Sequence, residues 1–345
     1  MRQHALWGLL TFAPALMSLG CVRTTGGPEG DRLTIGAYAV VREVFHDGPL
    51  PAFAAHWKAK TGRAVTFAES YNASGAQTRA IAAGFDVDLA ALSLEDDMEA
   101  LVRAGRVKPD WKSGPTKGML SRSLVVVGCR PGNPKGIRDW DDLARPGVGV
   151  LYPDPKTSGS ARWNIAAIFG AALLASKEAH GGEPDLKAVR ERLARVQANV
   201  VNMDPSGRQS MANFAERVTS DVIISYENEL LLGRKLGREI PHVIPPATLL
   251  IESPVALVET SVRRHQNREV AEAFLAFLTG PEGQKILAEY GFRPALDGVP
   301  DMSDRPLPPK LFTIADLGGW PKVQEEVFGP KGLWTSVFAD RREGR

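Results

Sequence analysis

Three short stretches of the chain are Ser70-Tyr71-Asn72-Ala73-Ser74-Gly75, Thr157-Ser158-Gly159-Ser160 and Asp204-Pro205-Ser206-Gly207-Arg208. Each is small and rich in hydroxyl groups, follows an apolar run of strand length, and leads into a segment with helical character. A helix start presents backbone N–H groups that lack an internal partner, at the positive end of the helix dipole. Three such junctions in one chain predict a pocket for a small oxyanion.

Around these junctions, apolar runs of strand length alternate with helical patterns. The alternation predicts an α/β fold with parallel strands and right-handed crossovers. The predicted strands are 33–37, 65–68, 87–92, 124–128, 148–152, 200–203, 222–225 and 254–258. The predicted helices are 53–61, 76–83, 95–104, 161–174, 186–198, 211–218, 270–278 and 282–290. We interpret the acidic run Glu95-Asp96-Asp97 as a solvated first turn, which the helix dipole favours.

No Pro-, Gly- or Ser-rich linker divides the chain into successive domains. We therefore expect two lobes that share the chain. Residues 31–119 together with 246–345 would form lobe 1, and residues 120–245 would form lobe 2. Two strands would cross between the lobes, an arrangement suited to hinge closure.

The N-terminus is typical of an export signal, which we assign to residues 1–20. Arg2 supplies a positive start, and the apolar run that follows is about fourteen residues long, too short to span a bilayer. Ser18-Leu19-Gly20-Cys21 resembles a bacterial lipobox, so we predict lipidation of Cys21; an ordinary signal peptide cut nearby is the alternative. Residues 21–30 have the composition of a flexible tether.

Charge and cysteine content exclude several classes of protein. The chain has 42 Lys and Arg against 40 Asp and Glu, so no basic excess points to nucleic acid. After Cys21, Cys129 is the only thiol, and its apolar neighbours predict a small buried residue. With two cysteines and no tight His cluster, the sequence offers no zinc site, and we expect no metal or cofactor.

Asp154-Pro155-Lys156-Thr157-Ser158-Gly159-Ser160-Ala161-Arg162 resembles the Asn-Pro-Lys-Ser/Thr-Ser-Gly-X-Ala-Arg segment of the bacterial sulfate- and thiosulfate-binding proteins of ABC importers. The resemblance extends over nearly all of the chain after the signal peptide. Further similar blocks, in the same order, are 55–62, 70–77, 132–143, 214–217, 227–229, 253–258, 281–284, 292–294 and 311–320.

The resemblance implies a two-lobed periplasmic-binding-protein type II fold and a set of ligand contacts. These are Ser74, Ser158, Gly159, Ser160, Gly207 and Tyr226. It also implies a binding protein without enzymatic activity that takes sulfate or thiosulfate and delivers it to permease subunits. Such a protein would act as a monomer in the periplasm or on the outer face of the cytoplasmic membrane, held there only by the lipid on Cys21.

Two departures from the family pattern leave the anion open. Tyr226 stands where sulfate binders have a Trp that donates its indole N–H, and Ala39 replaces an acid near the family's site. Molybdate and phosphate therefore stay as alternative ligands. A secreted hydrolase using Ser74 or Ser158 is a different class, but neither serine lies in a Gly-X-Ser-X-Gly elbow. A sensory lipoprotein is a further alternative.

Overall fold

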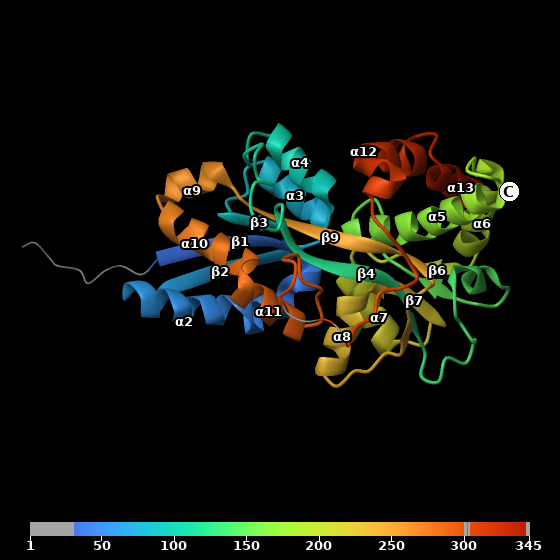
Figure 1. Cartoon of the computed structure of the whole chain (residues 1–345), viewed down its shortest axis with the longest axis horizontal. Coiled ribbons are helices and arrows are strands. Elements are labelled where there is room, and N and C mark those ends of the chain that lie inside the picture. Colours follow the sequence, from blue (N-terminus) through green and yellow to red (C-terminus); the bar gives the residue numbers. More distant parts are fainter. Residues whose placement is uncertain (1–30, 300–301, 303, 343–345) are drawn as a thin grey trace, which may run out of the picture.

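The computed structural model describes residues 31–299, 302 and 304–342 (Figure 1). The predicted signal peptide, the tether and the lipidation site Cys21 lie outside the described residues. No helix within the described part of the chain is long and apolar enough to cross a bilayer.

A single mixed sheet runs through the molecule in the order β2-β1-β3-β9-β4-β7-β5-β6, with β10 paired to β9 and β8 paired to β4. Pairing within β1–β2, β1–β3, β5–β6 and β5–β7 is parallel. The strands are β1 (Asp31–Tyr38), β2 (Val65–Asn72), β3 (Leu89–Ala91), β4 (Met119–Cys129), β5 (Val150–Leu151), β6 (Val200–Asn202), β7 (Val222–Tyr226), β8 (His242–Val243), β9 (Ala247–Leu257) and β10 (Lys310–Phe312).

The two longest strands, β4 and β9, run antiparallel to each other across the middle of the molecule (Figure 1). The last residues of β9 pair with β3, and the last residues of β4 pair with β7. Each long strand therefore belongs to both sides of the sheet. We call the side with β1, β2 and β3 the first lobe and the side with β5, β6 and β7 the second lobe; β4 and β9 are the two crossover strands that join them.

Helices cover the sheet in both lobes. The 21-residue helix α5 is buried along most of its length in the second lobe, whereas α2 ends at Gly62, whose φ of 75° is the left-handed conformation expected just past a helix end. The helices are α1 (Arg42–Asp47), α2 (Pro49–Thr61), α3 (Ser74–Ala82), α4 (Glu95–Arg103), α5 (Gly159–Ala179), α6 (Leu186–Ala198), α7 (Gly207–Glu216), α8 (Glu227–Lys235), α9 (Glu259–His265), α10 (Arg268–Thr279), α11 (Pro281–Glu289), α12 (Gly319–Val323) and α13 (Leu333–Arg342).

The C-terminal helices contact the second lobe, and α12 also contacts α4 of the first lobe. Helix α13 contacts α6 (Figure 1). The ring of Trp320 in α12 packs edge to face on that of Trp163 in α5, with the ring centroids 4.8 Å apart. The sequence prediction assigned all of 246–345 to lobe 1, and within this range α13 contacts α6 of the second lobe. The proposed domain boundaries stay a prediction.

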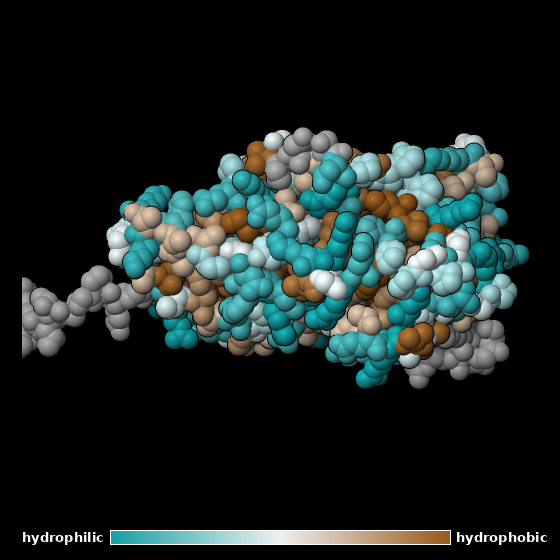
Figure 2. Space-filling view, turned by 90° about the horizontal axis from the view of Figure 1, so that it is seen from below, coloured by the Kyte–Doolittle hydropathy of each residue, from teal (hydrophilic) through white to brown (hydrophobic). Residues whose placement is uncertain are grey.

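The surface is largely hydrophilic on the face shown in Figure 2, where hydrophobic residues form small scattered groups. The buried apolar side chains form one large cluster and two smaller ones. The large cluster includes Leu33 and Ile35 of β1 as well as Val150 and Val222 of the second lobe. The hydrophobic core therefore continues across the crossover strands.

Candidate functional site

The starts of α3, α5 and α7 face one small cavity between the lobes, which we call the central pocket. It is also bordered by the end of β1 and by Ser93, which lies in the short segment between β3 and α4. The residues that line it are Tyr38, Ala39, Val40, Ala73, Ser74, Ser93, Ser158, Gly159, Ser160, Ser206 and Gly207.

The starts of α3 and α5 carry no side-chain cap. Ala73 precedes α3 and has no capping group, and Ser158 precedes α5 without capping it. Instead, the Ser158 and Ser160 hydroxyl oxygens lie 2.7 Å apart. Only α7 has a cap, because Ser206 accepts a hydrogen bond from the Gln209 N–H at 3.2 Å. The first N–H groups of two helices are thus left for another acceptor, and the helix dipoles favour a negative one.

Hydrogen bonds hold the two second-lobe loops of the pocket together. The Asp154 N–H donates to the Asp204 carbonyl at 2.7 Å, and the Thr157 hydroxyl donates to the Pro205 carbonyl at 2.8 Å. The Ser158 N–H donates to the Asp154 carbonyl at 2.8 Å. The starts of α5 and α7 are therefore fixed relative to each other, although about fifty residues separate them in the chain.

Ser74 directs its hydroxyl proton away from the role expected of a ligand donor. It donates to Asp97 Oδ2 at 2.6 Å and accepts from the Ser93 N–H at 2.9 Å. Asp97 is buried, so the interpretation of Glu95-Asp96-Asp97 as a solvated turn was wrong for this residue. Burial raises the pKa of Asp97, although the bond from Ser74 and the charge of Arg162 act in the opposite direction. In this arrangement Ser74 offers the pocket its backbone N–H.

Tyr226 lies behind the pocket and does not line it. It ends β7 with an exposed fraction of 1 %, and its hydroxyl oxygen lies 2.7 Å from that of Ser93. Burial raises the pKa of the Tyr226 phenol well above its usual value, and the charge of Glu229 acts in the same direction. The hydroxyl therefore keeps its proton and can donate it.

No charged side chain lines the central pocket among the described residues. Ala39, where the family pattern has an acid, is one of the lining residues. Charged side chains line a neighbouring groove between the lobes. They are the cations of Arg79, Lys156 and Arg162 and the acids Asp96 and Asp97. The pocket is thus lined by neutral dipoles, and charged side chains of both signs line the neighbouring groove.

Two glycines at the pocket are required by close packing. A Cβ atom on Gly159 would lie 2.8 Å from the Ser93 Cβ, across the lobe boundary. A Cβ atom on Gly207 would lie 2.6 Å from the Ser160 hydroxyl oxygen. Contacts below 3.0 Å force a neighbour to move, so both positions favour glycine.

The structure brings five of the six predicted ligand residues together: Ser74, Ser158, Gly159, Ser160 and Gly207. Sequence reasoning missed Tyr38, Ser93 and Ser206 as pocket residues. Ser206 lies inside a stretch already singled out. Ser93 had a usable signal, because it too is a small hydroxyl residue between a predicted strand and a predicted helix.

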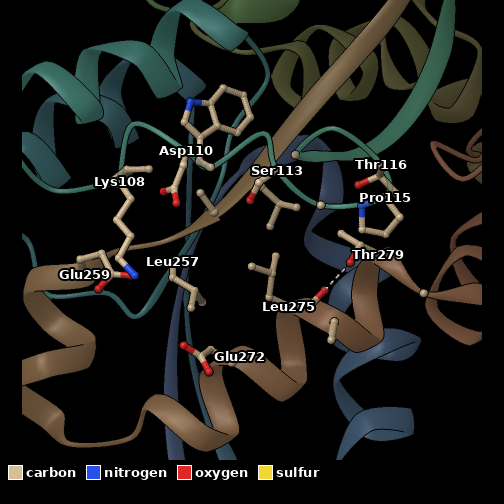
Figure 3. Close-up of a pocket in the computed structure, with 18 residues that line it drawn as sticks. Lys108, Asp110, Ser113, Pro115, Thr116, Leu257, Glu259, Glu272, Leu275 and Thr279 are labelled. Atoms are coloured by element: carbon tan, nitrogen blue, oxygen red, sulfur yellow. Dashed lines mark hydrogen bonds and ion pairs between the residues drawn. The ribbon is translucent and has the colours of Figure 1, made fainter.

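A larger cavity of about 430 Å³ lies elsewhere, in the first lobe between the loop before β4 and helix α10 (Figure 3). Leu257 and Leu275 form its apolar wall, and three carboxylates line it against one ammonium group. The acids are Asp110, Glu259 and Glu272, and the cation is Lys108, which lies 3.4 Å from Glu259. Carboxylates repel an anion, so this cavity does not suit an oxyanion despite its size. The chemistry favours the smaller central pocket.

The pocket also lacks the parts of a serine hydrolase. No histidine is among its described lining residues, and the Ser74 hydroxyl donates to the Asp97 carboxylate rather than to an imidazole. Nor do the described residues contain a group of three or more His, Cys, Asp or Glu placed to hold a metal ion.

Two lobes joined by two crossover strands, with a small pocket rich in hydrogen-bond donors between them, define a two-lobed binding protein of the periplasmic type. The chain belongs to the bacterial extracellular solute-binding protein family, whose model matches residues 47–293.

Named relatives are similar over most of their length. A sulfate-binding protein of Synechococcus elongatus is 40% identical over 316 residues, covering 90% of this chain and 88% of the relative. A sulfate-binding protein of Escherichia coli is 38% identical, with 83% and 87% covered. A thiosulfate-binding protein of Pseudomonas aeruginosa is 30% identical, with 95% and 98% covered. These relatives are solute-binding proteins rather than enzymes.

Solved structures agree with the fold. The sulfate-binding protein SubI from Mycobacterium tuberculosis H37Rv superposes with a TM-score of 0.77 and 39% identity, covering 86% of this chain and 99% of that one. The periplasmic binding protein P5PA, at 17% identity and a TM-score of 0.62, covers 91% and 100% and shares the fold alone.

Proposed function

We propose that this protein is the extracytoplasmic solute-binding component of an ABC importer and captures sulfate in the central pocket, with thiosulfate as the first alternative. The proposal is supported by relatives named sulfate-binding or thiosulfate-binding protein, which are similar to this chain over most of its length. The proposed direct contacts come from both lobes. They are Ser74, Ser158, Gly159, Ser160 and Gly207.

One observation carries the choice of ligand: the pocket is lined by hydroxyls and helix N-termini, and by no carboxylate of the described part of the chain. A fully ionised dianion has no proton to donate, so it needs donors only, and a carboxylate facing it would favour a protonated oxyanion instead. Each hydrogen bond to a charged group is worth about 1.5–3 kcal/mol net. Micromolar binding requires only about −8 kcal/mol overall, which several such bonds can supply after desolvation.

The proposal includes the surroundings of the protein. An export signal and a lipid on Cys21 would hold it at the outer face of the cytoplasmic membrane, and closed, loaded protein would dock on permease subunits. Membership of an extracellular solute-binding family supports this placement. No bond of the anion is broken in this function.

Titration calorimetry of the purified protein with sulfate, thiosulfate, molybdate and phosphate tests the proposal. We expect sulfate to bind at micromolar concentration or better and phosphate to bind much more weakly, because hydrogen phosphate needs an acceptor. Mass spectrometry of protein purified without added ligand would show which anion it retains. Absence of heat with all four anions would overturn the proposal. Tighter binding of molybdate or phosphate than of sulfate would show that the proposed ligand is wrong.

A further inference from the structure

Ser93 lines the central pocket and takes part in three hydrogen bonds. It stands between β3 and α4 with an exposed fraction of 1 %. Its N–H donates to the Ser74 hydroxyl at 2.9 Å, its carbonyl accepts from the Trp163 indole N–H at 2.8 Å, and its hydroxyl oxygen lies 2.7 Å from that of Tyr226. Both its backbone and its side chain are therefore held in place.

Two of these three bonds cross the boundary between the lobes. Ser93 follows β3 of the first lobe, whereas Trp163 is the fifth residue of α5 and Tyr226 ends β7, both in the second lobe. Gly159 also packs here, since a Cβ atom on it would meet the Ser93 Cβ at 2.8 Å. Ser93 thus joins the lobes at a residue that also lines the pocket.

The hydroxyls of Ser93 and Tyr226 differ in whether they can reach a ligand in the pocket. Each hydroxyl has one proton, and Tyr226 is buried away from water. The Ser93 oxygen is the hydrogen-bond partner described for the Tyr226 hydroxyl. Either hydroxyl could be the donor, but of the two residues only Ser93 lines the pocket. A buried O–H without an acceptor is costly, so with an anion in the pocket Tyr226 donates to Ser93 and the Ser93 proton is left for the anion.

We propose that Ser93 is a ligand-binding and specificity-determining residue of the central pocket, and that Tyr226 is a positioning residue that acts through it. The inference rests on the proposed function and assigns the anion a donor that the pattern of junctions did not indicate. Because Tyr226 occupies a lone pair of the Ser93 oxygen, Ser93 meets the ligand as a donor. That favours a fully ionised oxyanion over one that carries a proton.

Calorimetry with sulfate and with phosphate on Ser93→Ala, Tyr226→Phe and the double variant tests this chain of bonds. We expect each single variant to bind sulfate about tenfold more weakly, the order of one lost bond to a charge. The double variant should lose no more than about twofold beyond the weaker single variant, because both changes remove the same donor. In stopped-flow traces the loss should appear as faster release. The ratio of sulfate to phosphate affinity should fall in all three.

Two matched substitutions control for general damage. Tyr152→Phe removes another buried phenol, bonded to Gln197 and Trp334, and Ser176→Ala removes a hydroxyl at the far end of α5. Both should bind sulfate as the unmodified chain does. Unchanged binding and selectivity in Tyr226→Phe, or a double variant whose loss equals the product of the single losses, would overturn the inference. An unmodified protein that binds no oxyanion would instead overturn the proposed function, and the inference with it.

Discussion

At the scale of single residues, the pocket contains a serine hydroxyl at a helix start that does not cap the helix. Ser158 occupies the N-cap position of α5, where a serine usually bonds to the first turn. Here its oxygen faces Ser160 at 2.7 Å instead, and both residues line the central pocket. One hydroxyl of this pair donates to the other, so the pair has one O–H proton left for a ligand.

Replacement Ser158→Ala should weaken sulfate binding by about 1–3 kcal/mol, the order of a lost hydrogen bond to a charged group. Stability should change little, because the hydroxyl caps no helix. Calorimetry gives the affinity and thermal unfolding the stability. Equal affinities for the variant and the unmodified chain would show that the Ser158 hydroxyl does not touch the ligand.

Glycine at position 159 is a second requirement at this scale. The change Gly159→Ala places a methyl group 2.8 Å from the Ser93 Cβ and 3.1 Å from the Leu94 Cγ, on the opposite lobe. We expect the lobes to close less well and the affinity to fall by about 1–3 kcal/mol. Gly159→Asp adds a charge that repels the anion and should abolish binding in the same titration.

The matched control is Gly114→Ala, because a Cβ atom there meets nothing within 4 Å. It should bind sulfate normally. If Gly159→Ala also binds normally, the lobes do not pack around Gly159 when the ligand is held.

At the scale of elements, the sequence predicted the parts that local signals specify. The alternation of strands and helices, the junctions before α3, α5 and α7, and the two crossing strands are confirmed. The sequence prediction made β4 and β9 too short. The missed residues, at the start of each strand, pair with the other strand, more than a hundred positions away in the sequence. Pairing partners of that kind leave no local pattern.

The same reason explains the missed residues. Ser93 acquires its role from Tyr226 and Trp163, which reach it only when the second lobe packs against the first. Asp97 follows two other acids and looked solvated, yet Ser74 and the fold around it bury the carboxylate. The placement of α13 on α6 likewise depends on a surface that an amphipathic pattern cannot identify.

Helix α9 ends in a charged cluster whose effect depends on pH. His265 bonds through Nδ1 to Asp88 at 2.7 Å and through Nε2 to Asp86 at 3.0 Å, and Arg264 pairs with Asp86 as well. Burial alone would lower the pKa of His265, but the bonds to Asp88 and Asp86 outweigh it and raise the pKa. A raised pKa means that the folded chain holds the proton more tightly than the unfolded chain.

This stabilisation is fully present below the usual histidine pKa of 6.5 and is lost as pH rises through the raised value. His265→Gln should therefore reduce the free energy of unfolding by about 0.5–1 kcal/mol at slightly acidic pH, with a smaller difference at alkaline pH. Urea unfolding across this range checks it. A difference that does not vary with pH would contradict a charged His265 in the fold.

At the scale of the whole molecule, a group of three charged residues spans the lobes next to the central pocket. Arg208, in the first turn of α7, lies 2.9 Å from Glu43 of α1 and 2.9 Å from Glu229 of α8, and it donates to the Val40 carbonyl at 2.9 Å. Its neighbour Gly207 lines the pocket. Two carboxylates thus oppose the charge of Arg208, which leaves the neutral donors as the main attraction for the ligand.

Glu229 makes this group sensitive to pH. Its exposed fraction is 1 %, and burial raises its pKa to about 7, with Arg208 acting to lower it and Glu43 to raise it. Tyr38 and Tyr226 lie close enough for the Glu229 charge to raise their pKa values too. Since the folded chain binds this proton more tightly than the unfolded chain, the fold is favoured at acidic pH and loses stability as pH rises from about 4.5 toward 7.

Substitution Glu229→Gln keeps the shape of the side chain and removes the titration. We expect the variant to match the unmodified chain near the lower end of that pH range. Above neutral pH it should gain up to about 3 kcal/mol relative to the unmodified chain, because the raised pKa of Glu229 already includes the attraction of Arg208. Unfolding by urea at a series of pH values measures this, and Glu216→Gln, at the exposed end of α7, is the control. A parallel pair of stability curves would mean that Glu229 is already ionised in the fold, and that Arg208 compensates its burial in full.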